Sequence, residues 1–166
     1  MAIKGLSYSK TSWSFEERPV ASSKLNLWDD RMEAAIELLS FLMAQQWGAQ
    51  NGVLRRTPAD DLAVKATSPV SLIVQVLPGY AFISNYVYRL NSTVQSATIA
   101  APVGNPRRDL VQARLATWDI SVKTGTPAAS PALPSVDTDC LALAELYCRP
   151  GMTSIKDADD ATNGYI

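Results

Sequence analysis

The pattern of apolar and polar positions changes once along the chain, near residue 50. Before that point, apolar residues recur with a 4-3-4-3 spacing at Trp28, Met32, Ala35, Leu39 and Leu42. Such spacing places the side chains on one face of a helix. Asn26 is a suitable N-cap and Gly48 a suitable C-terminal stop. We therefore predict one long helix over residues 26–48.

The partner of this helix is left open by the sequence. Ile36, Leu38 and Met43 widen the apolar stripe beyond the narrow seam of a two-stranded coiled coil. The helix can pack on a sheet of its own domain, or against the same helix in other copies of an oligomer. Three heptads are too short a run to decide between the two arrangements.

From Val53 onward, short runs of Val, Ile, Leu, Thr and Tyr alternate with Pro, Gly and Asn, a pattern typical of strands and turns. Eight strands are predicted, at 62–67, 72–76, 80–83, 85–90, 95–99, 109–117, 121–124 and 141–148. Trp118-Asp119 would lie in a hairpin, and Gly79 after Pro78 in a turn with positive φ. Strands without intervening helices indicate an antiparallel sheet protein. We predict a mainly β fold, a jelly-roll-like antiparallel β-sandwich over residues 52–150.

Three other segments have distinct compositions. Residues 1–25 form a polar arm with Trp13 and Phe15, whose rings require a surface to cover them, so a docking arm is predicted. The proline-rich residues 125–135 are predicted to cross the surface in polyproline conformation. Residues 151–166 are predicted to be a solvated acidic tail.

Composition and charge remove several classes of function. Fifteen basic and sixteen acidic residues give a net charge of −1, which supplies no electrostatic footprint for nucleic acid. The chain has no histidine, so histidine-based nucleophile systems and histidine-ligated metals are excluded. An apolar fraction of 47% indicates a folded domain. We expect no membrane insertion, because the longest apolar stretch is too short and too polar to span a bilayer.

Motifs and residue spacing in the sequence indicate no catalytic or metal site. The acidic run from Asp157 does not match an EF-hand loop, and no phosphate-binding loop or nucleophile elbow occurs. Glu145 has no evident carboxylate partner for glycoside hydrolysis. Cys140 and Cys148 are eight residues apart in one predicted strand, too far for a disulfide, and are expected to be reduced core thiols. We predict no catalytic, cofactor-binding or metal-binding residues.

The basic pairs Arg55-Arg56 and Arg107-Arg108 lie in predicted turns, each near an acidic residue. We interpret them as surface ion pairs rather than as a binding patch.

Six segments occur in order at 52–54, 61–66, 71–83, 105–115, 123–134 and 141–146. The most specific is Gly-Thr-Pro-Ala-Ala-Ser-Pro at 125–131, preceded by Pro-Arg-Arg-Asp-Leu-Val at 106–111. Over residues 52–150 this series resembles a domain of tailed-bacteriophage structural proteins, particularly baseplate, tail-fibre and receptor-binding components. The resemblance implies a non-enzymatic, compact β-sandwich that is usually trimeric. The Asp-rich C-terminal segment departs from the arginine-bearing strand of that family, and we expect no distal receptor-binding module.

The leading expectation is therefore a virion structural protein, made in the host cytoplasm and acting as an oligomeric anchor, adaptor or short fibre component of the tail or baseplate. Its expected partners are further copies of itself, as a homotrimer, and other virion proteins. The candidate docking and oligomer contacts are Trp13, Phe15, Trp28, Met32, Leu39 and Leu42.

Two alternatives stay open. A head fibre or capsid decoration protein would suit the same features equally well. A carbohydrate-binding, receptor-recognition module is the other alternative, with a host-surface glycan as partner. Its candidate sugar contacts are Tyr80, Tyr86, Tyr88 and Trp118. However, Tyr86 and Tyr88 lie two residues apart on one strand face, which favours burial of both rings.

Overall fold

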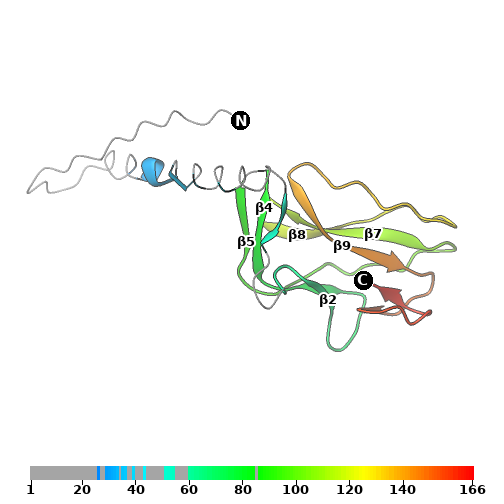
Figure 1. Ribbon diagram of the computed structural model, residues 1–166. Helices are drawn as coiled ribbons and strands as arrows, with labels where there is room; N and C mark the ends of the chain where they lie inside the picture. Colours follow the sequence, from blue (N-terminus) through cyan, green and yellow to red (C-terminus); the bar gives the residue numbers. More distant parts are fainter. Residues whose placement is uncertain are drawn as a thin grey trace, which may run out of the picture. The chain divides into compact units, whose positions relative to one another are not determined.

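The computed structural model describes residues 26, 29–33, 35, 36, 39, 43, 51–54, 60–84 and 86–166. The chain divides into two compact units, Met1–Ala49 and Gln50–Ile166 (Figure 1). In the first unit, the ten described residues between 26 and 43 are all helical. They agree with the predicted helix, although its continuity over residues 26–48 stays a prediction. The predicted arm over residues 1–25 lies outside the described residues.

The second unit is built from short strands in three sheets. The strands are β1 (Gly52–Leu54), β2 (Val64–Ala66), β3 (Val74–Val76), β4 (Gly79–Ile83), β5 (Tyr86–Leu90), β6 (Val94–Gln95), β7 (Arg107–Arg114), β8 (Asp119–Lys123), β9 (Cys140–Cys148), β10 (Ile155–Lys156) and β11 (Gly164–Tyr165). The sheet orders are β1-β4-β5, β2-β3-β6 and β10-β11-β9-β7-β8. All pairings are antiparallel except the parallel pair β10–β11. The predicted mainly β, antiparallel fold class is confirmed at this level.

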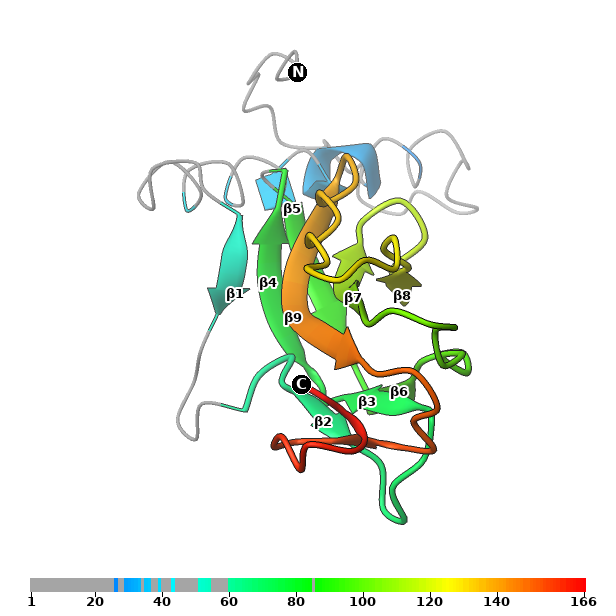
Figure 2. The same ribbon diagram turned by 90° about the vertical axis from the view of Figure 1, so that its right-hand side faces the viewer.

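The three sheets share one hydrophobic core (Figure 2). Val76 of β3, Tyr88 of β5, Val111 of β7 and Leu146 of β9 are fully buried in the same cluster. Successive side chains of a strand point to opposite faces, so each of these residues lies on the core-facing side of its strand. Every described member of the cluster, and every described side chain packed against it, lies between Val53 and Ile166.

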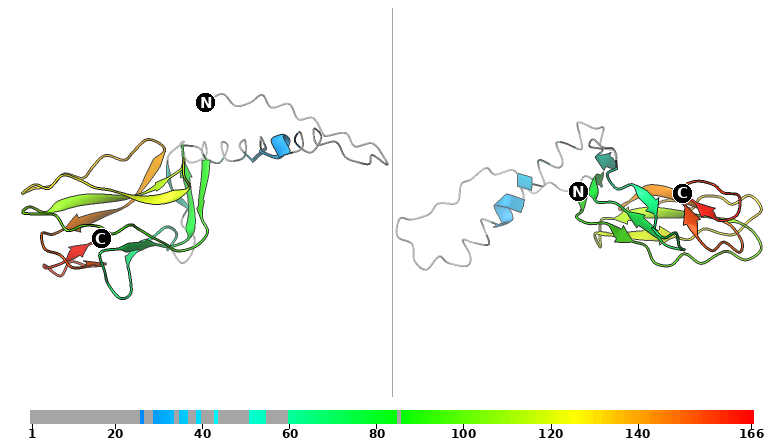
Figure 3. Two further views of the ribbon diagram at one scale, coloured as in Figure 1. Left: turned by 180° about the vertical axis from the view of Figure 1, so that it is seen from behind. Right: turned by 90° about the horizontal axis from the view of Figure 1, so that it is seen from below.

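Strand β7 is buried on both of its faces. Val111 belongs to the core, whereas its neighbour Leu110 points to the opposite face and is also buried. Residues 124–139, here called the arm segment, cover that opposite face. Figures 1 and 3 show the arm segment in yellow and orange along one side of the β7–β9 pair, with β2 on the other side. The arm segment therefore adds an outer layer to the central sheet.

Contacts within the arm segment follow a period of three. Gly125, Ala128, Pro131 and Pro134 are half-buried, whereas the residues between them are exposed. A polyproline II helix has three residues per turn, so one of its three faces lies against the sheet. The predicted surface-crossing connection is confirmed as an extended segment without sheet pairing.

The arm segment is fastened at both ends to β7. At its start, the amide of Gly125 donates to Asp109 Oδ1 at 2.9 Å, and the amide of Ala128 donates to the carbonyl of Pro106. At its end, Asp137 and the buried Gln112 exchange two hydrogen bonds. The side-chain amide of the buried Gln112 thus has a hydrogen-bond partner for both its nitrogen and its oxygen.

Arg107 and Asp109 correct the prediction of a surface ion pair in a turn. Both lie in β7, and the Asp109 side chain is fully buried. Arg107 donates to both carboxylate oxygens, Nε to Oδ1 at 2.7 Å and Nη2 to Oδ2 at 2.8 Å. A buried carboxylate requires such a bidentate partner. Arg55 and Arg56 lie outside the described residues.

The prediction of a solvated tail over residues 151–166 is wrong for about half of these residues. Met152 and Ile155 are buried in the core, and the amide of Ile155 donates to the carbonyl of Ser71. Strands β10 and β11 then extend the sheet next to β9. Asp157 is exposed as expected, yet it accepts the amide hydrogen of Ala66 at 2.6 Å. The acidic composition of this segment gave no indication of these two short strands.

The prediction that Gly79 lies in a turn with positive φ is also wrong. Its φ is not positive, and it opens strand β4 rather than completing a turn. A Cβ at this position would lie 2.6 Å from the Leu62 amide nitrogen and 2.9 Å from Asp61 Cα. Glycine is required here because two backbones approach closely, which is its other common role.

Acid is expected to loosen the C-terminal strands before the core. The hydrogen bond from Lys156 lowers the pKa of Asp160, as do those from Asn163, and the hydrogen bond from Arg149 lowers the pKa of Asp159. A carboxylate whose folded pKa is depressed stabilises the fold above the unfolded pKa, and this contribution is lost as pH falls through the folded pKa. Below about pH 4, hydrogen-exchange protection factors of the Gly164 and Ile166 amides should fall while those of β7 persist.

The variant Asp160→Asn is the matched control for this pH effect. It should show reduced protection of the same amides already at neutral pH, with a flatter dependence on acid. Equal protection of β11 and β7 down to global acid unfolding would contradict the expectation.

Candidate functional site

The structure describes the side chains of two of the six predicted docking contacts, Met32 and Leu39. Met32 and Leu39 are helical and are 47% and 60% exposed. Ile36 is 60% exposed and Met43 is 50% exposed. The other predicted contacts lie outside the residues whose side chains the structure describes: Trp13, Phe15, Trp28 and Leu42.

The four exposed large apolar residues of the helix form one stripe. Met32, Ile36, Leu39 and Met43 are spaced 4, 3 and 4 residues apart, so they lie on the same helix face. We call them the helix stripe. Full burial of such a side chain contributes roughly 1.5–3 kcal/mol. A stripe of this spacing is the kind of surface that another helix buries in a coiled coil.

A second surface feature is the turn between β7 and β8, where Trp118 is 54% exposed. Its ring stacks on Tyr88, with centroids 5.8 Å apart and an interplanar angle of 10°. The predicted hairpin around Trp118-Asp119 is confirmed. Tyr88 is fully buried, as expected for a core residue. Burial is the main cause that raises the pKa of Tyr88 to about 12, and the negative charge of Asp119 is the second cause. Of the two rings, Trp118 is therefore the one open to solvent.

Charged groups surround this turn. Arg114 Nε and Nη2 donate to the two oxygens of Asp119, and Thr117 Oγ1 donates to Asp119 Oδ1 at 2.6 Å. The hydrogen bond from Arg114 is the largest cause of the lowered pKa of Asp119. The carboxylate is thus ionised and oriented at neutral pH.

Hydrogen bonds join the turn after β4 and the turn before β9 to each other and to the β7–β8 turn. Ser84 Oγ donates to Asp139 Oδ1 at 2.6 Å, and the Leu115 amide donates to the Asp139 carbonyl. Ser84, Trp118 and Asp139 all have φ between 50° and 54°. The sequence predicts the hairpin around Trp118, but it contains no signal for the positive φ of this residue or for the contact of its ring with Tyr88.

Other acidic residues of the β unit form ion pairs with nearby basic side chains. In the part of the chain that the structure describes, no three His, Cys, Asp or Glu side chains gather as a metal site. Arg149 pairs with Asp159 at 2.9 Å and Lys156 with Asp160 at 2.6 Å. Glu145, for which the sequence indicated no partner, pairs with Arg108 at 3.0 Å across β7 and β9.

Cys140 and Cys148 are free, buried thiols at the two ends of β9, as predicted. Burial raises the pKa of Cys148 to about 12, and the charge of Asp109 adds to this effect. Burial also raises the pKa of Cys140. Both thiols therefore stay protonated at neutral pH, unlike a thiolate nucleophile.

Among the described residues, no helix is long and apolar enough to cross a membrane. Comparison of the chain with protein-family models, curated proteins and solved structures finds no match.

Proposed function

We propose that this chain is a non-enzymatic virion structural protein of a tailed bacteriophage, an oligomeric anchor or short fibre component of the tail or baseplate. In this proposal the helix joins copies of the chain, and a jelly-roll-like β-sandwich forms the body. The proposal extends to a homotrimer that contacts other virion proteins, with the predicted arm over residues 1–25 as the docking segment.

The helix stripe is the observation on which the proposal depends most. Four large apolar side chains that are each about half exposed or more leave a surface that water solvates poorly. Ala35 is exposed beside the stripe, so the apolar face is wider than a two-stranded seam. A wide face of this kind suits three helices better than two.

The architecture of the β unit supports a structural role. The arm segment is fastened to β7 by Asp109 at one end and by Gln112 at the other. Long surface segments in compact domains are often binding loops or disordered linkers. Here the hydrogen bonds instead make the segment part of a rigid body, which is what a mounting component needs. The sequence resemblance over residues 52–150 supplies the assignment to a tailed phage.

Oligomeric state is the first test. By multi-angle light scattering at micromolar concentration, the full chain should have a mass near three times 18.0 kDa. The double variant Ile36→Asp/Leu39→Asp should shift it toward 18.0 kDa, because buried charges without partners are strongly unfavourable. Its circular dichroism should retain the β signal, since the described core lies after residue 53.

The matched control is Glu33→Gln, an exposed helical position outside the stripe, which should leave the mass unchanged. A wild-type chain that stays near 18.0 kDa would overturn the oligomer. Gold-labelled antibody on particles purified from the producing bacterium then tests the location. Label at the tail tip supports the proposal, whereas label over the head indicates a head fibre or decoration protein.

A further inference from the structure

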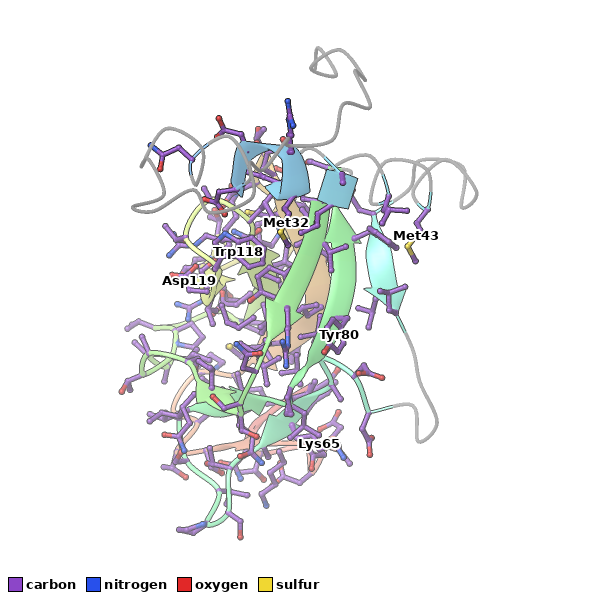
Figure 4. The ribbon with its side chains drawn as sticks, turned by 90° about the vertical axis from the view of Figure 1, so that its left-hand side faces the viewer. Met32, Met43, Lys65, Tyr80, Trp118 and Asp119 are labelled. Carbon is purple, nitrogen blue, oxygen red and sulfur yellow. The ribbon has the colours of Figure 1, made fainter. Side chains whose placement is uncertain are left out.

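We propose that strand β8 pairs with β8 of a second copy of the chain, in an antiparallel ladder about a two-fold axis at Ser121. We call this contact the β8 junction. Strand β8 is the last strand of its sheet, so one of its sides has no neighbouring strand in the described part of the chain. Figure 4 labels Asp119, where β8 begins, on the opposite side of the β unit from β1, which is drawn in cyan. The inference depends only on the β unit and is separate from the proposed contact of the helix stripe.

The strand register shows which backbone groups face the open side of β8. The amide of Leu115, the residue after β7, donates to the carbonyl of Asp139, the residue before β9. Odd-numbered residues of β7 therefore bond toward β9, and even-numbered residues bond toward β8. The partners of the even-numbered residues are Asp119, Ser121 and Lys123. The amide and carbonyl groups of Ile120 and Val122 consequently point away from β7, and such an edge is a template for another strand.

The sequence of β8, Asp-Ile-Ser-Val-Lys, is complementary to itself in this arrangement. With the axis at Ser121, Asp119 lies opposite Lys123 of the second copy, and Ile120 lies opposite Val122 of that copy. Each Ile–Val pair exchanges backbone hydrogen bonds in both directions, because these residues carry the outward-facing groups. Side chains come closest in the pairs without backbone hydrogen bonds, which here are the oppositely charged pairs and the small serines at the axis.

The charges at the two ends of β8 favour a second copy in one alignment. Asp119 is 42% exposed and Lys123 is 31% exposed, although each already pairs within its own chain, with Arg114 and Asp137 respectively. The β8 junction would extend these pairs into a row of alternating charge that crosses from one copy to the other. A parallel alignment would instead place like charges side by side, which is unfavourable.

The other edge strands in the described part of the β unit lack this property. Strands β1, β2, β6 and β10 are two or three residues long, which leaves few backbone groups for a ladder. Strand β5 has five residues, but Arg89 is its only charged residue, so a second β5 would supply no opposite charge. Edge strands are commonly protected from pairing by charged side chains. In β8 the charges stand only at the ends and have opposite signs, which permits pairing in one register.

The size of the β8 junction sets its strength. Five residues per copy bury far less than the roughly 800 Å² per partner of a stable protein interface. We therefore expect a dissociation constant of about 0.1–1 mM. Copies that are held side by side in one assembly reach effective concentrations in the millimolar range, at which such a contact forms. The β8 junction would thus be a lateral contact between copies that are already mounted together.

The test uses the full-length variant Ile36→Asp/Leu39→Asp, in which the helix stripe no longer joins copies. By sedimentation equilibrium, its mass should rise from 18.0 kDa toward twice that value between about 10 µM and about 1 mM. Adding Val122→Pro should keep the mass near 18.0 kDa over the same range, because proline has no amide hydrogen to donate. Proline is tolerated at an edge where the amide faces outward, so the pairing of β7 with β8 should persist.

A matched control and a second readout separate the β8 junction from a change in folding. Val122→Thr keeps the amide and a branched side chain, and its mass in the same background should rise as in the parent variant. Hydrogen exchange measured by NMR needs no change in β8. In the parent variant, the Ile120 and Val122 amides should gain protection as concentration rises, whereas the Ser121 amide, already bonded to β7, should not change.

Two results would overturn the proposal. The first is a mass of the parent variant that stays at 18.0 kDa up to about 1 mM, which would leave the proposed contact of the helix stripe untouched. The second is self-association in which another edge gains protection and the Ile120 and Val122 amides do not.

Discussion

Replacing Asp109 by alanine is expected to lower the free energy of unfolding of the β unit by about 3–5 kcal/mol, measured by chemical denaturation. The fully buried carboxylate accepts two hydrogen bonds from Arg107, one from the Gly125 amide and a weak one from the Cys148 thiol. Its removal leaves the guanidinium buried without a counter-charge and releases the start of the arm segment.

Two comparisons isolate the effect of burial. Glu145→Ala breaks the pair with Arg108, whose side chains are 42% and 40% exposed, and should cost no more than about 1 kcal/mol. The double variant Arg107→Met/Asp109→Leu removes both charges and should be less destabilised than Asp109→Ala alone. Equal losses from Asp109→Ala and Glu145→Ala would show that the buried pair has no special energetic role.

Replacing Gly125 by alanine should have the second large effect. A Cβ there would lie 2.0 Å from the backbone carbonyl oxygen of Arg108, so the arm segment or β7 must move. Overpacking a rigid contact costs about 3 kcal/mol. Movement would also lengthen the 2.9 Å hydrogen bond from the Gly125 amide to Asp109. We expect this loss in the free energy of unfolding, together with faster hydrogen exchange at residues 125–137.

The same substitution at Gly52 is the control. No atom lies within 4 Å of a Cβ built on Gly52, which is a residue of the short strand β1. Gly52→Ala should therefore leave stability unchanged or raise it by about 0.5–1 kcal/mol through reduced freedom of the unfolded chain. A harmless Gly125→Ala variant would mean that the arm segment is not fixed against β7.

Strand prediction from sequence succeeded best where the run of β-favouring residues is long. Seven of the eight predicted strands overlap an observed strand over most of its length, and β9 at Cys140–Cys148 differs from its prediction by one residue. The strand predicted at 95–99 overlaps β6 (Val94–Gln95) only at Gln95. The missed strands β1, β10 and β11 are two or three residues long. Such segments have no measurable period, and β10 and β11 pair only because Met152 and Ile155 are drawn into the core.

The residues of the candidate site likewise include some that the sequence indicates and some that it does not. Helical spacing is a local property, so the sequence predicts an apolar helix face. Of the positions with the predicted 4-3-4-3 spacing, Met32 and Leu39 belong to the helix stripe, and Ile36 and Met43, which the sequence places beside that face, complete it. The buried pair of Arg107 and Asp109 was not visible, because alternation alone does not say that a second layer covers the outer face of β7. Nor does the sequence indicate that the Trp118 ring stacks on Tyr88, since the two residues come from strands and turns that are distant along the chain.

The confinement of the described core to residues 53–166 has an evolutionary consequence. The described residues before residue 50 contribute no side chain to this core. Under the proposed function, the helical attachment surface is thus encoded apart from the described core, and it can diverge toward different attachment partners while that core is kept. Selection on where the protein is mounted and selection on how it folds would then act on separate stretches of one gene.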